Sequence, residues 1–199
     1  MTLRELRSFL VVGVIFLAIS PGCGQLQTPG SAGESSKDFY PNTDGYRWDY
    51  KQTSSSTTEV TTISDLRTGS KKLSSGTNVD VSLETMTSTN RPSTMEYYER
   101  VLDSGVWFYG TGVATTEAEL FLPFPLAVGN TWRTSGGTSF NVVTVITAKE
   151  TVKVPAGTFD AYRVESGSST YWYGKGAGLV KIAGSGPSAV TLELTGKNF

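Results

Sequence analysis

Histidine is absent from this sequence of 199 residues, and cysteine occurs once, at Cys23. Without histidine, the chain lacks the commonest metal ligand and the usual general base of enzymes at neutral pH. A single cysteine excludes an intramolecular disulfide. Charged residues make up only 18% of the chain and sum to a net charge of −1, so nothing in the charge favours binding to nucleic acid.

Catalytic motifs are missing as well. Neither a G-x-S-x-G elbow nor an S-x-x-K motif occurs, and residues 174–178 (GKGAG) lack the spacing of a phosphate-binding loop. Asp44 and Asp49 flank Trp48 in a way that suggests a sugar site, but acids of an exposed turn or strand explain them equally well. We therefore expect no enzyme, no metal site and no cofactor, and only a minor alternative of a hydrolase that uses Asp or Glu.

The N-terminus has the order of a secretory signal peptide. Arg4 and Arg7 precede residues 9–19 (FLVVGVIFLAI), which contain no polar side chain. This apolar run is shorter than the ~20 residues that a membrane-spanning helix needs. The run leads to Ser20-Pro21-Gly22-Cys23, and we assign residues 1–22 to the signal peptide.

The segment that ends in Cys23 resembles a bacterial lipoprotein signal. In that family the chain is cleaved just before a cysteine whose thiol carries a diacylglycerol, and Gly22 matches the small residue wanted before the cut. Ser20 and Pro21 depart from the usual pattern, and ordinary secretion with a free thiol is the alternative. The resemblance implies lipid attachment at Cys23, which would anchor the protein firmly to a membrane. Residues 23–38 then comprise the lipid attachment and a flexible tether.

The rest of the chain, residues 39–199, has strand patterns throughout and no helical periodicity. Val79, Val81 and Leu83 alternate with polar residues, as in a strand with one wet face. Residues 140–148 are apolar on both faces, which suggests a central strand. Residues 74–78 and 155–157 have the composition of turns. We predict an all-β, antiparallel domain of about ten or eleven strands, forming a curled sheet, a half-barrel or a two-layer sandwich.

One motif occurs twice: aromatic-Pro-x-x-x-Gly-x-x-Trp, at residues 40–48 and 124–132. Each copy is followed by a second matching segment, residues 97–101 (YYERV) or 161–164 (AYRV), and then by a second tryptophan, Trp107 or Trp172. This order predicts two tandem β units, about 39–118 and 119–199. Within the motif, glycine permits a positive φ in the turn before a strand, and tryptophan buries a large area.

Three segments of the second half also resemble uncharacterised bacterial cell-envelope lipoproteins. They are residues 124–132, 154–164 and 172–181, which look like the landmarks of that family. The resemblance implies an antiparallel β domain of the cell envelope and no catalytic residues.

We therefore expect a non-catalytic, extracytoplasmic module, anchored through acylated Cys23, that binds a protein or polymer partner. The resemblance to bacterial lipoproteins favours the outer membrane if the host has one, because Gly24 is not the aspartate that often retains members of that family at the inner membrane. The alternative is a carrier or sensor of an apolar ligand in a β-sheet groove. That alternative gains support if several large aromatic side chains point into an open groove; they are Trp48, Trp107, Phe108, Trp132, Trp172 and Tyr173.

Overall fold

The computed structural model describes residues 35–88, 91–136 and 140–199. The predicted signal peptide, Cys23 and most of the predicted tether lie outside these residues. The elements are a 3-10 helix, η1 (Ser36–Phe39), and twelve strands: β1 (Arg47–Ser54), β2 (Thr57–Lys72), β3 (Asn78–Ser88), β4 (Arg91–Leu102), β5 (Gly105–Thr111), β6 (Glu119–Pro123), β7 (Thr131–Gly136), β8 (Phe140–Val154), β9 (Gly157–Ser166), β10 (Ser169–Gly174), β11 (Gly178–Gly184) and β12 (Val190–Lys197). Within the described part of the chain, no helix is long and apolar enough to cross a membrane.

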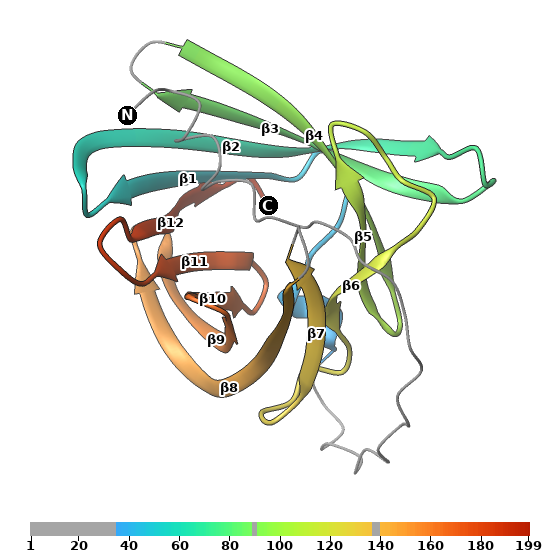
Figure 1. The fold of residues 1–199 in the computed structure, drawn as a ribbon. Coiled ribbons are helices and arrows are strands. Elements are labelled where there is room, and N and C mark those ends of the chain that lie inside the picture. Colours follow the sequence, from blue (N-terminus) through green and yellow to red (C-terminus); the bar gives the residue numbers. More distant parts are fainter. Residues whose placement is uncertain (1–34, 89–90, 137–139) are drawn as a thin grey trace.

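All twelve strands belong to one antiparallel sheet with the order β6-β5-β4-β3-β2-β1-β12-β11-β10-β9-β8-β7. From β1 to β6 and from β7 to β12 each strand pairs with the next one in the chain, and β1 pairs with β12, so that the first and last strands lie side by side (Figure 1). The sheet curls until its two edges, β6 and β7, come into contact. Bulges in many of the strand pairs, such as those after Arg67 and Ile146, add to the curvature.

The predicted all-β, antiparallel fold is confirmed, in its curled-sheet form. The described residues contain twelve strands rather than ten or eleven, because the Ser/Thr-rich stretch 53–90 supplies two long strands, β2 and β3. Both predicted repeat units lie in the same sheet. The predicted turns at 74–78 and 155–157 join β2 to β3 and β8 to β9, and residues 174–178 join β10 to β11.

The two copies of the aromatic-Pro motif share the conformation of their glycine and the backbone hydrogen bonds beside it, whereas the aromatic-Pro peptide bond is cis in the second copy, at Phe124-Pro125. Gly45 and Gly129 have φ of 85° and 94°, as the motif predicts. The N–H of Gly45 donates to the carbonyl of Arg67, and Arg67 donates back to Tyr46. In the second copy, Gly129 donates to Ile146, and Ile146 donates back to Asn130. Arg67 and Ile146 therefore occupy equivalent positions beside the two motifs.

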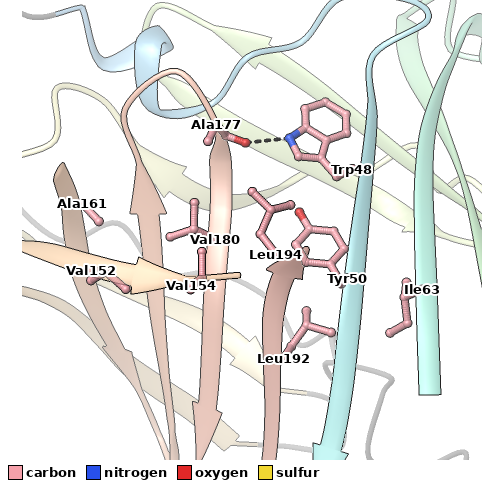
Figure 2. Close-up of a cluster of buried hydrophobic side chains, with 10 residues drawn as sticks. All are labelled: Trp48, Tyr50, Ile63, Val152, Val154, Ala161, Ala177, Val180, Leu192 and Leu194. Atoms are coloured by element: carbon pink, nitrogen blue, oxygen red, sulfur yellow. Dashed lines mark hydrogen bonds between the residues drawn. The ribbon is translucent and has the colours of Figure 1, made fainter. Parts of the chain in front are cut away.

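Buried side chains form three separate clusters. The largest joins β1, β2, β8, β9, β11 and β12, and it contains Trp48, whose indole N–H donates to the carbonyl of Ala177 at 2.6 Å (Figure 2). A second cluster surrounds Ile146 and includes Phe39 of η1. The third contains Val79, Tyr98 and Tyr109, with Ala114 and Ala118 of the β5–β6 connection packed against it.

The third cluster lies on the face of β3 that points away from the inside of the curled sheet. This corrects the expectation that the polar residues of β3 form its solvent-facing side. Val79 is fully buried, as its apolar character predicts. The alternating polar residues of β3, however, do not form a wet outer face, because Ser82 and Glu84 line the inside of the curled sheet. The connection between β5 and β6 covers the apolar face instead. Residues 140–148 belong to β8, which is paired on both sides but lies next to the edge strand β7.

Candidate functional site: a cavity with one ionic wall

The curled sheet encloses a cavity of about 580 Å³. This volume lies within the ~300–1,000 Å³ that is typical of sites for small molecules. One part of its wall, formed by β9 to β12, is mainly apolar and aromatic: Val164, Tyr171, Tyr173, Leu179, Ile182 and Leu192. The facing residues of β2, β3 and β4 are mainly polar or charged: Asp65, Arg67, Ser82, Glu84, Tyr97 and Glu99. The cavity therefore has chemically distinct walls.

The segment that begins with η1 packs against the domain, and its next two residues, Tyr40 and Pro41, line the cavity. Phe39 is 1% exposed and packs edge-to-face on Tyr162, with ring centroids 4.9 Å apart. The carbonyl of Asp38 accepts from the N–H of Gly176 at 2.7 Å, and the Ser36 hydroxyl accepts from Leu126. These contacts bring the last residues of the predicted tether onto the domain.

The cavity reaches the surface at the N-terminal end of β10. Exposed residues of the β9–β10 turn, Gly167 and Ser168, line it there, together with Ser185 of the β11–β12 connection. The two connections are joined by a hydrogen bond of 2.9 Å from the N–H of Ser185 to the carbonyl of Ser168. A hydroxyl-rich rim thus surrounds the approach to the cavity.

We call the polar and charged side formed by β2, β3 and β4 the ionic wall, and it is centred on Arg67 of β2. Its side chain is only 2% exposed, and its Nη2 donates to Oε1 of Glu99 on β4. The hydroxyl of Tyr40 donates to the other oxygen of Glu99 at 2.6 Å. Burial, together with the charge of Glu99, holds the pKa of Tyr40 well above its usual value, so this hydroxyl keeps its proton and acts as a donor.

Asp65 and Glu84 lie opposite each other on β2 and β3. Burial, reinforced by the charges of Glu99 and Glu84, raises the pKa of Asp65 to about 7. Burial also raises the pKa of Glu84, although Tyr97 donates a hydrogen bond to it at 3.2 Å. At neutral pH the Asp65 carboxyl is therefore divided between its neutral and ionised forms, and it can donate as well as accept hydrogen bonds.

Several polar atoms of the cavity wall are buried without a hydrogen-bond partner among the described residues. They are Nε and Nη1 of Arg67, Oδ1 of Asp65 and the indole nitrogen of Trp132. Buried polar groups are paired in the great majority of proteins, and an unpaired one costs roughly 1–3 kcal/mol. They belong to residues that line the cavity, which makes them candidate hydrogen-bonding partners for a molecule bound there.

The aromatic residues singled out in the sequence divide into two sets. Trp48, Phe108, Trp132 and Tyr173 line the cavity. The other two do not line it: the indole nitrogen of Trp107 donates to Ser104, and that of Trp172 donates to Glu150.

The acids that flank Trp48 are not part of the cavity wall. Asp44 is exposed in a turn, and Asp49 pairs with Arg47 at 3.2 Å. The lipid-attachment residue predicted at Cys23 lies outside the described residues. Among those residues, no cluster of three or more His, Cys, Asp or Glu is arranged to hold a metal ion.

Sequence reasoning missed Asp65, Arg67, Glu84 and Glu99. Along its strand, each of these residues has neighbours whose side chains point to the opposite face of the sheet. The local sequence around it is therefore the same as that around a polar residue in contact with solvent. Ile63 gave a weak signal, because it shares its face with Asp65 and Arg67 and is itself 3% exposed.

No protein-family model matches the chain, and no curated protein matches it. Two solved structures are similar to it. One is a "putative exported protein with YmcC-like fold" from Bacteroides fragilis, with 12% identity, 80% of this chain and 98% of that chain covered, and a TM-score of 0.46. The other is a "putative lipoprotein" from Parabacteroides distasonis, with 16% identity, the same coverage and a TM-score of 0.43.

Proposed function

We propose that this chain is a lipid-anchored module of the bacterial cell envelope that binds a small, mainly apolar ligand inside its curled sheet and carries or senses it. The observation that supports binding is the cavity of about 580 Å³, which is lined by aromatic side chains and reaches the surface beside exposed turns. A sheet that only had to be stable would fill this space with side chains, because protein interiors are close-packed.

The anchor and the location rest on the sequence. The signal peptide and Cys23 support attachment to the outer side of a membrane, with the outer membrane favoured in a host that has one. Binding of a protein or polymer partner, which the sequence favoured, stays a prediction. The cavity supports the alternative drawn from the sequence, because four of the six named aromatic residues line it.

Quenching of tryptophan fluorescence by an acyl chain that carries bromine tests ligand binding. Bromine quenches an indole at contact, and Trp48 and Trp132 line the cavity. The mature protein is purified from the membranes of its host and exchanged from detergent into an amphipathic polymer. It is then titrated with ω-bromoundecanoyl glycerol. We expect saturable quenching with one ligand per chain.

A matched pair of variants locates the ligand. Ser166→Phe places a ring in the cavity near its rim, whereas Thr158→Phe places the same ring at an exposed position of the same strand, β9. We expect Ser166→Phe to abolish saturable quenching and Thr158→Phe to leave it unchanged. Absence of saturable quenching in the unaltered protein, or equal quenching in Ser166→Phe, would contradict the proposed function.

A hydrolase that uses Asp or Glu is a second candidate, which one specific observation favours. Asp65 combines a pKa raised to about 7 with a second carboxyl, Glu84, on the neighbouring strand, and both line the cavity. A carboxyl with a pKa near neutrality can act as a general acid. Hydrolysis of nitrophenyl glycosides that is abolished in Asp65→Asn, and that in the unaltered protein falls as the pH rises through ~7, would support this candidate; a Thr158→Asn control should keep the activity.

A further inference from the structure

We propose that Arg67 and Asp65 form the polar end of the ligand site, and that this end binds an uncharged, oxygen-bearing head group such as the hydroxyls and ester carbonyl of a monoacylglycerol. This inference rests on the proposed function, since it names the chemistry of the molecule that the cavity would hold.

The guanidinium of Arg67 is the first argument. Its side chain is 2% exposed, and Nη2 donates to Glu99. Nε and Nη1 are buried without a hydrogen-bond partner among the described residues, and Arg67 is one of the residues that line the cavity. A guanidinium has donors only, so a molecule that satisfies these two groups must present acceptors, which are usually oxygen atoms.

The charge of the wall argues that the head group is neutral. The positive charge of Arg67 is already balanced by Glu99, which it contacts directly. An anionic head would be repelled by the carboxyls of Asp65 and Glu84 wherever these are ionised, and a cationic ammonium head has no acceptor for the unpaired N–H groups of Arg67. A hydroxyl avoids both penalties, because it accepts from Arg67 and donates to Oδ1 of Asp65, the oxygen that lacks a partner.

Comparison of the two halves of the sheet shows that the fold does not require a charge at this position. Arg67 and Ile146 close the same turn with the same pair of backbone hydrogen bonds. Ile146 does so as a fully buried member of an apolar cluster. A buried ion pair is often no more stabilising than well-packed apolar residues of similar volume. The ion pair of the first half therefore needs a reason other than stability, and recognition of a polar group supplies one.

The remaining walls fit the other end of such a molecule. Leu179, Ile182 and Leu192 line the cavity from β11 and β12, on the other side of β1 from the ionic wall. An acyl chain that lies against them would leave its head group near β2 and β3. The ligand would thus be held by apolar contact along its chain and by hydrogen bonds at its head.

Three probes with the same brominated chain but different head groups test this inference. They are ω-bromoundecanoyl glycerol, ω-bromoundecanoate and ω-bromoundecylammonium, each titrated at neutral pH by quenching of tryptophan fluorescence. The variant Arg67→Met/Glu99→Gln removes both charges together and keeps an acceptor for Tyr40, so that no buried charge is left alone. Its control is Arg163→Met/Glu165→Gln, which removes an ion pair of 3.0 Å that is not part of the cavity wall.

We expect the neutral probe to bind the unaltered protein most tightly. Arg67→Met/Glu99→Gln should weaken its binding about tenfold, as loss of one or two hydrogen bonds implies, and the control should not change it. Tighter binding of the anion or the cation, or unchanged binding in Arg67→Met/Glu99→Gln, would overturn the inference and leave the proposed function standing. If no probe binds the unaltered protein saturably, the proposed function itself fails.

Discussion

Replacing Asp65 by asparagine should remove a pH dependence from the stability of the fold. The pKa of this carboxyl is about 7 in the folded chain, against 3.8 for the group in water, because burial and the neighbouring charges of Glu99 and Glu84 oppose its ionisation. The folded state therefore holds the proton more tightly than the unfolded state does. Stability is then highest below pH ~4 and falls as the pH rises toward ~7.

The size of this effect follows from the shift. Each pKa unit corresponds to about 1.4 kcal/mol, so a shift of roughly three units sets an upper limit of about 4 kcal/mol on the stability lost between pH ~4 and pH ~8. The contribution of Glu84, whose pKa is also raised, is present in both proteins and largely cancels when they are compared. We expect the advantage of Asp65→Asn over the unaltered protein to grow by about 2–4 kcal/mol over this range.

Urea unfolding at several pH values, followed by tryptophan fluorescence, measures this difference directly. Asp49→Asn is the control, because Asp49 lies on β1 next to Arg47 and is not part of the cavity wall. Its difference from the unaltered protein should not grow in the same way. A difference between Asp65→Asn and the unaltered protein that stays constant from pH ~4 to pH ~8 would refute the reasoning, since it would mean that Asp65 ionises equally easily in both states.

Four further predictions concern single side chains. Phe39→Ala should lower the free energy of unfolding by about 3–5 kcal/mol, because it empties a site that is 1% exposed; a loss below ~1 kcal/mol would show that η1 adds little to the domain. Gly174→Ala should lower the free energy of unfolding by about 1–3 kcal/mol, since its Cβ would lie 2.8 Å from Val180 and 2.9 Å from Phe159. The Cβ of Gly176→Ala would meet no atom within 4 Å, although the φ of 68° at this position strains a residue that has a side chain. Trp48→Phe should cost at least ~1 kcal/mol through loss of the hydrogen bond to Ala177, and an unchanged urea midpoint would contradict it. Cys23→Ala should abolish acylation, which the intact mass of protein from host membranes shows; a native chain that is soluble and unmodified would refute the anchor.

The turns and the class of fold could be predicted from the sequence because they depend on local chemistry. Gly45 and Gly129 adopt the positive φ that the motif requires, and residues 155–157 form the expected connection between strands. The sequence could not determine the number of strands, because Thr-rich segments such as 57–72 suit both long strands and loops.

The candidate site could be predicted only in its aromatic half. Trp48 and Trp132 stood out through the repeated motif, and both line the cavity. The ionic half escaped because alternation along a strand separates two faces without showing which one lies inside a curled sheet. In β3 the polar face turned inward, and the apolar face around Val79 was covered by the β5–β6 connection.

The distribution of the buried clusters explains how the domain can keep a cavity and remain folded. The largest cluster lies between β8, β9 and β11 and the seam of β1 and β12, the second surrounds Ile146, and the third lies under the β5–β6 connection. Apolar burial contributes roughly 25 cal/mol per Å² wherever it occurs, so the domain does not need one filled centre. The ionic wall adds little to stability and leaves donors of Arg67 unpaired. Variants of the ionic wall that remove a positive and a negative charge together should therefore fold normally but bind the ligand differently. A site selected for packing would instead lose stability when its residues are replaced.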